Sequence, residues 1–460
     1  MKPIQLISPV DGSVYAERMP LTPEAAAERV ARAKVAQRDW AAMPLADRIA
    51  RVTAGIARLG DQKVRIVEEL AWQMGRPTRY GGEFGGVNQR TEYMAGIAAE
   101  ALAPMVVEAS DRFERRIARE PLGVVFVIAP WNYPYLTAIN SIVPALIAGN
   151  AVMLKHASQT LLVGERLAEA LHAGGVPEAV FQNVVLDHAT TEALIGARSF
   201  GFVNFTGSVA GGAAIERAAA GTFTALGLEL GGKDPGYVRE DADLDAAVDG
   251  LMDGAMFNAG QCCCGIERIY VQARHFDTFV ERAEAWVAQL RLGNPFDAAT
   301  TLGPMAHKRF AATVRAQTAE AIAAGAKPLI DPARFPDDGG AYLAPQILIN
   351  VDHSMRVMRE ESFGPVVGIM PVSGDDEAIA LMNDSPYGLT ASIWTGDAAA
   401  AGEIGAQVET GTVFMNRCDY LDPALTWTGV KDTGRGTSLS ALGYQSVTRA
   451  KSYHLKKVLT

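Results

Sequence analysis

The sequence predicts an α/β fold with two parallel-sheet domains, and two observations predict it. First, a chain of 460 residues exceeds what one hydrophobic core usually supports. Second, short apolar runs, typical of strands buried on both faces, alternate with helix-like sequence. The first series of runs lies at 122–129, 151–154, 182–186 and 202–205, and a second begins near Leu228 and continues at 266–271, 366–371 and 411–416. Such alternation indicates parallel sheets with helices on both sides.

The amino-terminal part is predicted to be mostly helical. Thr22 suits a helix cap and Pro23 a first helical turn, so a helix should begin there and run to about residue 43. Residues 47–75 have the pattern of further helix. In the second domain, the Ala-rich stretch at 310–324 predicts another helix.

Composition excludes several classes of partner. The formal net charge of -10 argues against nucleic acid and anionic membranes, because both are bound mainly through clustered Lys and Arg. The most apolar stretch, 142–154, is interrupted by Pro144, Gly149 and Asn150 and predicts no membrane span. The first residues lack the features of signal and transit peptides. We therefore expect a cytoplasmic protein with free thiols.

Three of the four cysteines are adjacent, at Cys262, Cys263 and Cys264. Neighbouring cysteines cannot form an ordinary disulfide and lack the usual spacing of metal ligands, so we expect no metal site. This clustering predicts that one of the three is a reactive nucleophile.

Three further segments carry candidate functional groups. Asn132 lies in a corner made rigid by Pro130 and Pro134, where a carboxamide can face an oxyanion, although its neighbours could equally be core aromatics around a turn. Glu229 ends an apolar strand, where it could act as a base or pair with a lysine. The glycine-rich turn at 205–212 follows a strand and opens a helix, so it is either a phosphate-binding turn or only a turn.

In combination, these motifs resemble the aldehyde dehydrogenase superfamily. The resemblance covers essentially the whole chain and rests on five motifs in order: PWN at 130–132, TGS at 206–208, ELGGK at 229–233, GQCC at 260–263 and EESFGP at 360–365. It implies a Rossmann-like cofactor-binding domain, a second α/β catalytic domain and a small β oligomerisation arm. The implied ranges are 1–103 with 123–228, then 229–427, and 104–122 with 440–460 for the arm and tail.

The resemblance also implies a reaction: NAD(P)-dependent oxidation of a small-molecule aldehyde to its acid. Cys263 would be the nucleophile and form a thiohemiacetal and then a thioester, while Asn132 holds the oxyanion and Glu229 activates water. Cys262 and Cys264 would pack as small buried hydrophobic residues. Two alternatives remain: a thiol-dependent esterase or hydrolase, and a non-catalytic binding protein with the same fold.

Eight residues match the family's cofactor site: Ile128, Trp131, Lys155, Ser158, Gly207, Ser208, Glu361 and Phe363. Ser158 stands where many NAD-preferring members have an acid. Because that carboxylate would repel a 2′-phosphate, its replacement predicts that NADP is tolerated beside NAD.

Substrate residues and assembly are implied in the same way. The implied pocket contains Tyr133, Leu136, Thr137, Asn140 and Leu421, and the segment 416–423 is implied to border its mouth. Within this segment, Arg417 could bind a substrate carboxylate or be an exposed or Asp-paired side chain. Trp427 and Thr428 depart from the family's usual late catalytic loop, and Cys418 has no assigned role. Pairing of the arm and tail between subunits predicts a homodimer or homotetramer.

Overall fold

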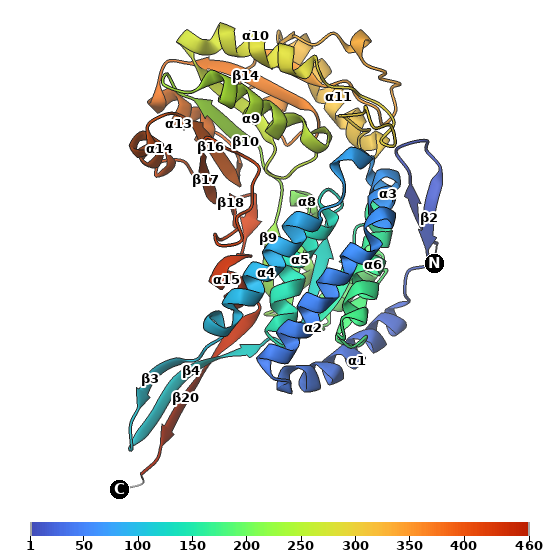
Figure 1. The fold of residues 1–460 in the computed structure, drawn as a ribbon, viewed down its shortest axis with the longest axis vertical. Helices are drawn as coiled ribbons and strands as arrows, with labels where there is room; N and C mark the ends of the chain where they lie inside the picture. The colour runs from blue at the N-terminus through green and yellow to red at the C-terminus, as the bar shows by residue number, and fades with distance from the viewer. Residues whose placement is uncertain (1, 459–460) are drawn as a thin grey trace.

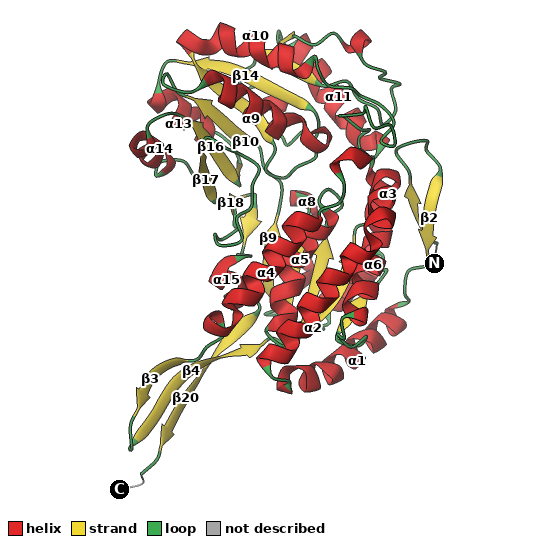
Figure 2. Cartoon of the chain, viewed as in Figure 1, coloured by secondary structure: helices red, strands yellow, loops and turns green. Residues whose placement is uncertain are grey.

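The computed structural model describes residues 2–458, which form two α/β domains and a projecting arm (Figures 1 and 2). The first domain contains a six-stranded sheet in the order β19-β9-β8-β5-β6-β7, parallel except for β19. Its strands are β5 (Val124–Ala129), β6 (Ala151–His156), β7 (Phe181–Asn183), β8 (Phe202–Thr206), β9 (Ala225–Glu229) and β19 (Gly434–Arg435). All four apolar runs form the predicted strands, although β7 ends before the run's last three residues.

Helices cover both faces of this sheet, as predicted. One face packs against α1 (Pro23–Ala42), α7 (His188–Gly196) and α8 (Val209–Ala219). The other carries α2 (Leu45–Ala57), α3 (Lys63–Met74), α4 (Phe84–Ala101), α5 (Pro134–Ile147) and α6 (Leu161–Ala173). Thr22 caps α1, and its hydroxyl oxygen accepts from the Ala25 amide at 3.1 Å. The predicted helix at 47–75 is two helices, separated by a 3₁₀ segment at Arg58–Gln62.

The second domain contains a seven-stranded sheet in the order β12-β13-β14-β11-β10-β16-β17, parallel except for β12. The strands are β10 (Asp234–Val238), β11 (Ile266–Gln272), β12 (Lys327–Pro328), β13 (Gln346–Ile349), β14 (Val366–Val372), β16 (Thr390–Trp394) and β17 (Thr412–Met415). One face packs against α9 (Leu244–Met256), α10 (Phe276–Val287), α11 (Lys308–Ala323) and α12 (Arg356–Arg359), and the other against α13 (Asp375–Asn383) and α14 (Ala398–Gly405). Glu229 ends β9 and so belongs to the first sheet.

The end of the chain returns to the first domain before it enters the arm. After β18 (Val430–Lys431) pairs with β15 (Tyr387–Gly388), α15 (Ser440–Ser446) packs against α4. The arm is an antiparallel sheet of β20 (Thr448–Lys456), β4 (Phe113–Pro121) and β3 (Met105–Ala109), and it extends away from both domains (Figure 1). Residues 440–446 of the implied tail are therefore a helix on the first domain, and the arm strand begins at Thr448. A hairpin of β1 (Ile4–Ile7) and β2 (Val14–Arg18) precedes α1.

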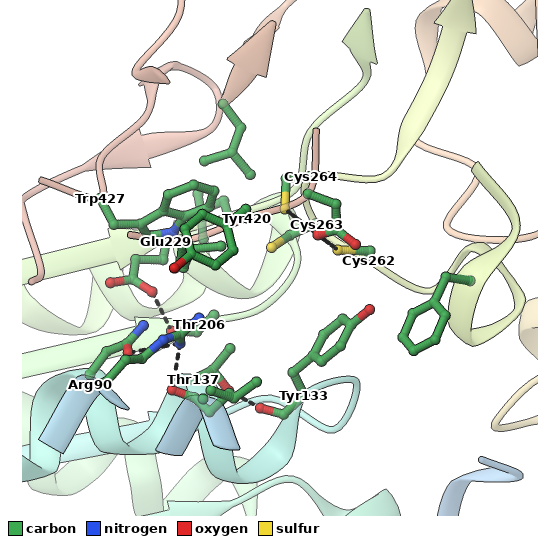
Figure 3. Close-up of a pocket in the computed structure, with 18 of the residues that line it drawn as sticks. Arg90, Tyr133, Thr137, Thr206, Glu229, Cys262, Cys263, Cys264, Tyr420 and Trp427 are labelled. Atoms are coloured by element: carbon green, nitrogen blue, oxygen red, sulfur yellow. Dashed lines mark hydrogen bonds between the residues drawn. The ribbon is translucent and has the colours of Figure 1, made fainter. Parts of the chain in front are cut away.

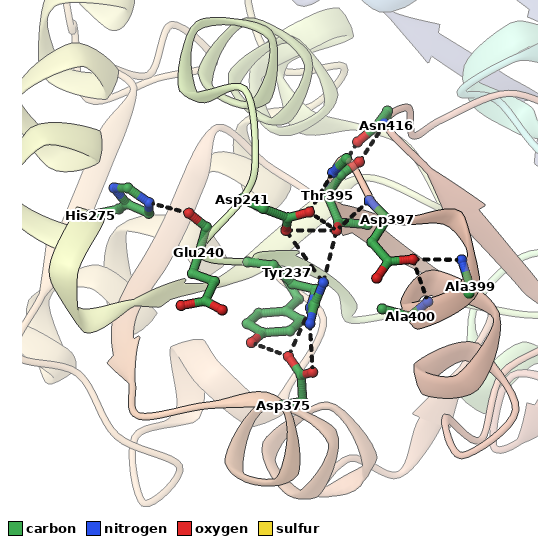
Figure 4. Close-up of polar contacts among 12 residues, drawn as sticks. Tyr237, Glu240, Asp241, His275, Asp375, Thr395, Asp397, Ala399, Ala400 and Asn416 are labelled. Atoms are coloured by element: carbon green, nitrogen blue, oxygen red, sulfur yellow. Dashed lines mark hydrogen bonds and ion pairs between the residues drawn. The ribbon is translucent and has the colours of Figure 1, made fainter.

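A polar network closes one edge of the second sheet (Figure 4). Arg239, directly after β10, makes two parallel bonds to Asp375 at the start of α13, both at 3.0 Å. Thr395, directly after β16, accepts from Arg239 and donates to Asp241. These contacts hold the carboxyl ends of β10 and β16 together. Because β10 and β11 are parallel and Cys263 precedes β11, the cysteines lie at the other end of the strands, and the network is structural. Between residues 2 and 458, no helix combines the length and apolarity needed to cross a bilayer.

Candidate active site

The loop before Cys263 has an unusual backbone that fixes the cysteine's position. Asn258, Ala259 and Gly260 have positive φ values of 53°, 56° and 68°. A side chain at Gly260 would meet the Gly364 carbonyl oxygen at 2.2 Å, so this close approach requires glycine. The Gln261 side chain then ties the loop down, because its Oε1 accepts from the Ala306 amide at 2.8 Å and its Nε2 donates to the Asn258 carbonyl at 2.9 Å.

The three cysteines differ in their surroundings. Cys262 and Cys264 are 4% and 1% exposed, whereas Cys263 is partly exposed. Cys262 and Cys264 pack in a buried apolar cluster, as expected. In addition, their thiols each lie 3.0 Å from Asp419 Oδ1 and can donate to it. All three Sγ atoms lie within 4.8 Å of one another despite their adjacent positions.

These neighbours also affect the reactivity of Cys263. The pKa of Cys263 lies well below its ordinary value, because the thiols of Cys262 and Cys264 donate to its sulfur. Each flanking thiol has a single proton, so Asp419 and the Cys263 thiolate compete for both donors. Burial raises the pKa of Asp419 to about 6. Cys418, by contrast, donates to the Gly250 carbonyl at 3.2 Å, and burial raises its pKa to about 12.

Glu229 lies at the carboxyl end of β9, facing Cys263. Its Oε2 accepts from the Thr206 hydroxyl at 3.2 Å. Burial raises the pKa of Glu229 above the usual carboxyl value, which suits a group that must take a proton near neutral pH. Lys233, which sequence offers as a partner for Glu229, is instead paired with Glu267.

Asn132 is buried in the corner between β5 and α5, and polar contacts fix its backbone. Its carbonyl oxygen accepts from Arg76 at 2.6 Å and from the Asn258 amide at 3.2 Å. Arg76 is in turn paired with Glu83 in a buried ion pair at 2.6 Å. The second Glu83 oxygen accepts from the Tyr135 amide at 2.9 Å and the Leu136 amide at 2.7 Å, so it neutralises the amino end of α5.

Two cavities meet at Cys263 and Glu229, and both residues line each of them. The first, which we call the substrate cavity, is drawn in Figure 3. Five of the six residues implied for substrate contact line it: Tyr133, Leu136, Thr137, Asn140 and Leu421. Trp427 lines it too. Arg417 does not, because it is exposed and its guanidinium lies 3.8 Å from the centre of the Tyr420 ring.

Sequence reasoning missed Gln89 and Arg90, two polar residues of the substrate cavity. Asp419 and Tyr420 line the cavity as well, and they lie in the segment 416–423 that is expected at its mouth, although the sequence singles out neither residue. Arg90 lies in the middle of α4, whose sequence gave no sign that one face would approach the cysteines. Asp419 follows Cys418 in an irregular loop with a positive φ of 49°, which short-range pattern does not predict. For Arg90, only the residue type, a charged side chain in a helix with a largely apolar face, could have signalled a place in the cavity.

The second cavity, which we call the cofactor cavity, lies between the two domains. It is lined by all eight residues implied for cofactor binding: Ile128, Trp131, Lys155, Ser158, Gly207, Ser208, Glu361 and Phe363. Asn132 lines it as well. Thus the eight residues, which come from both domains, surround one space.

The chemistry of this lining fits a dinucleotide. Ser208 caps α8, so the free amide groups of the helix's first turn and its positive dipole end suit a pyrophosphate. Glu361 Oε1 accepts from the Gly232 amide at 3.0 Å, and its oxygens occupy the space that a side chain at Gly231 would fill. Trp131 and Phe363 meet edge to face at 5.4 Å. The cavity thus offers the apolar rings of Trp131 and Phe363 to a flat ring of the ligand, and the carboxylate of Glu361 to the hydroxyls of its sugar.

Comparisons with known proteins agree with this geometry. The model of the aldehyde dehydrogenase family matches residues 1–453. A betaine aldehyde dehydrogenase from Rhizobium etli is 34% identical over 453 residues, which cover 96% of this chain and 92% of that protein. Two solved structures each have a TM-score of 0.92 to this structure, and each match covers 99% of this chain. One is the NADP-dependent glyceraldehyde-3-phosphate dehydrogenase of Bacillus halodurans with NADP, at 32% identity and 96% coverage of that chain. The other is the betaine aldehyde dehydrogenase of Staphylococcus aureus with NAD+, at 29% identity and 92% coverage. The chain therefore belongs to the aldehyde dehydrogenase family, whose members oxidise aldehydes with a nicotinamide cofactor.

Proposed function

We propose that Cys263, Asn132 and Glu229 carry out the oxidation of an aldehyde to its carboxylic acid in this protein. One observation above all supports these roles: Cys263 and Glu229 line both cavities, so a nucleophile and a base lie where the substrate and cofactor spaces meet. The lowered pKa of Cys263 favours the thiolate, which adds to the aldehyde carbon.

The oxyanion that forms on this addition needs hydrogen-bond donors. The buried Asn132 amide is one donor, and the Cys263 backbone amide is the other. The residues of the cofactor cavity would hold a nicotinamide cofactor, which would supply the hydride acceptor for oxidation of the thiohemiacetal on Cys263 to a thioester. Glu229 then takes a proton from water, which attacks the thioester carbon, releases the acid and restores the Cys263 thiolate.

We propose that NADP is used as well as NAD. Lys155 and Ser158 line the cofactor cavity together with His188, and burial lowers the pKa of Lys155. Glu229 and Glu361 are the acids of this lining, and both interact electrostatically with Cys263. The Lys155 end therefore offers a 2′-phosphate a cation and a hydroxyl.

We also propose a homodimer or homotetramer in the cytoplasm. The arm supports the assembly, because β3 and β20 are outer strands and Met105, Val106 and Val107 on β3 are 65%, 63% and 56% exposed. The need for a reduced Cys263 supports a reducing compartment.

The roles can be tested with a panel of aldehydes and both cofactors, with reduced nicotinamide as the readout. Cys263→Ala should abolish oxidation, whereas the matched variant Cys262→Ala should keep most of it. Glu229→Gln should release about one reduced nicotinamide per site rapidly and then turn over slowly, because the thioester forms but is not hydrolysed. If Cys262→Ala is the inactive variant, or if Glu229→Gln turns over normally, the assignment is wrong.

A further inference from the structure

Arg90 is a buried cation without an ion-pair partner in the substrate cavity. It is 7% exposed, and among residues 2–458 no carboxylate oxygen lies within ion-pair distance of its guanidinium. One terminal nitrogen, Nη1, donates to the Leu136 carbonyl and to Asn140 Oδ1, both at 3.0 Å. These two bonds leave Nε and Nη2 with three N–H groups that have no acceptor in the described part of the chain.

A buried charge of this kind is costly unless something compensates it. Removal of a guanidinium from water is unfavourable, and burial lowers the pKa of Arg90, although Glu83 and Glu229 act electrostatically in the opposite direction. A methionine of similar length could fill the same space without this cost. An arginine with free N–H groups in this cavity therefore points to a ligand that brings a negative charge into direct contact with it.

Asn140 fixes the guanidinium in the wall of the cavity. Its Oδ1 accepts from Arg90 Nη1 at 3.0 Å, and the residue is 2% exposed. Its Nδ2 has no hydrogen-bond partner but is enclosed by the protein, so a ligand in the cavity does not reach it. The free N–H groups that a ligand can reach therefore belong to Arg90.

The acids of the same cavity do not supply an acceptor for these groups. Glu229 Oε2 accepts from the Thr206 hydroxyl, and Asp419 Oδ1 accepts from the thiols of Cys262 and Cys264. Figure 3 shows Arg90 on the same side of the cavity as Thr206 and Glu229, whereas Tyr133 lies on the far side.

We propose that Arg90, held in place by Asn140, binds a carboxylate at the far end of the substrate, so that the preferred substrate is an ω-oxo carboxylic acid. The planar guanidinium can bond both oxygens of one carboxylate in a fork, while Asn140 Oδ1 fixes its orientation. This inference rests on the proposed function and specifies its substrate class. Arg90 is the only Lys or Arg in the lining, so a carboxylate with one charge is matched better than a phosphate with two.

The rival role for Arg90 is electrostatic support of Glu229. Its positive charge favours the ionised form of Glu229, so its loss could slow hydrolysis of every thioester alike. The two roles predict different substrate preferences. A carboxylate-binding Arg90 favours charged over neutral aldehydes, whereas an Arg90 that only supports Glu229 affects both alike.

The first experiment uses the unaltered protein. Rates are compared for 4-oxobutanoate, its methyl ester and butanal, with the preferred cofactor. We expect kcat/KM for 4-oxobutanoate to exceed that for the ester by roughly 30-fold or more. Glutarate should inhibit butanal oxidation competitively with the aldehyde, whereas glutaramide should not. Equal rates for acid and ester, or preference for glyceraldehyde 3-phosphate, would overturn the inference.

The second experiment uses variants. Arg90→Met should raise KM for 4-oxobutanoate and reduce its kcat/KM by roughly 30-fold or more, while kcat/KM for butanal changes by less than about threefold. Arg90→Lys should restore part of the preference, because it keeps the charge but loses the fork. The control is Arg32→Met, on an exposed position of α1. An equal loss of kcat for acid and butanal, with their kcat/KM values unchanged, would assign Arg90 to support of Glu229 in thioester hydrolysis.

Failure of this inference is distinguishable from failure of the proposed function. If butanal is oxidised in a Cys263-dependent manner but the carboxylate brings no advantage, the reaction stands and the substrate class falls. If no aldehyde reduces either cofactor, both fall together.

Discussion

The side-chain amide of Asn258 donates a hydrogen bond of 3.2 Å to the backbone carbonyl of Asn132. The same amide nitrogen lies 3.3 Å from the Gln261 carbonyl. Asn258 therefore connects the oxyanion corner of the first domain with the loop that carries Cys263 in the second. Asn132 and Cys263, the proposed oxyanion donor and nucleophile, are 131 positions apart in the sequence and owe their relative position partly to this one side chain.

Asn258→Asp should reduce kcat with little change in KM. The carboxylate keeps the size of the side chain and tolerates its positive φ of 53°, but it has no N–H groups and repels both carbonyls. A shift of the oxyanion donor relative to the nucleophile costs about 100-fold in rate for each ångström or so. We therefore expect a loss of roughly 10- to 100-fold in kcat in steady-state assays. Asn416→Asp, in the network of Figure 4, is the matched control and should retain normal kcat. Normal kcat in Asn258→Asp would show that the connection is dispensable.

Asp419→Asn should lower the pKa of the Cys263 thiol. The substitution removes a negative charge that interacts with Cys263 and frees the thiols of Cys262 and Cys264 to donate to its sulfur. We expect this decrease to appear as a shift to lower pH of the pH dependence of alkylation by iodoacetamide. Asp422→Asn removes the same charge three residues later, where the carboxylate accepts only from the Ala424 amide. A shift of equal size in Asp422→Asn would mean that general charge, not the thiol network, sets the pKa.

The strands of both sheets could be predicted because each is a short apolar run buried on both sides. β5 is the clearest case, since all six of its residues are buried. The cofactor residues could be predicted from local motifs that end strands or begin helices. Arg90 could not, because its role depends on how α4 packs beside a loop that lies more than 160 positions later in the chain. For Arg417 the sequence leaves an exposed and an inward-facing position open, because a polar loop gives no signal of which side chains face inward, and the structure has it exposed.

Glu229 should give the reaction an acid limb above the ordinary carboxyl pKa of 4.5. Burial raises the pKa of Glu229, so as the pH falls the carboxyl gains its proton early and can no longer accept one from water. We expect kcat to decrease on acidification through this raised pKa, and single-turnover formation of reduced nicotinamide to persist to lower pH. If both steps decrease together, Glu229 does not limit hydrolysis.

The same shift has a consequence for stability. A carboxyl whose pKa is higher in the folded than in the unfolded protein stabilises the fold most when it is protonated. This contribution is lost as the pH rises from the pKa of the unfolded state through the pKa of the folded state. Glu229→Gln should therefore raise Tm at pH 7 and leave it nearly unchanged below about pH 4. Thermal unfolding of both proteins at the two pH values measures this difference, and a variant that is less stable at pH 7 would contradict it.

Ser158→Glu should shift cofactor use from NADP toward NAD. A carboxylate beside Lys155 would neutralise that cation and repel a 2′-phosphate, while it could accept from the ribose hydroxyls of NAD. We expect the ratio of kcat/KM for NADP to that for NAD to fall roughly 100-fold, about 2.7 kcal/mol. The control is Ser199→Glu, which adds the same charge away from the cofactor cavity. An unaltered enzyme that already prefers NAD by more than roughly 100-fold would remove the basis of this prediction.

The arm should determine the oligomeric state through its outer strand β3. Met105, Val106 and Val107 are exposed on this strand, and an apolar edge with free N–H and C=O groups favours pairing with a second subunit. Val106→Lys with Val107→Lys should place two charges in that pairing and convert the protein to a smaller species in light scattering coupled to size-exclusion chromatography. Phe223, 95% exposed on the first domain, provides the control for loss of an exposed apolar side chain. Because the arm strands project from the domains, the double variant should keep the Tm of the domains. If the double variant keeps its mass, or if Phe223→Lys dissociates instead, the interface lies elsewhere.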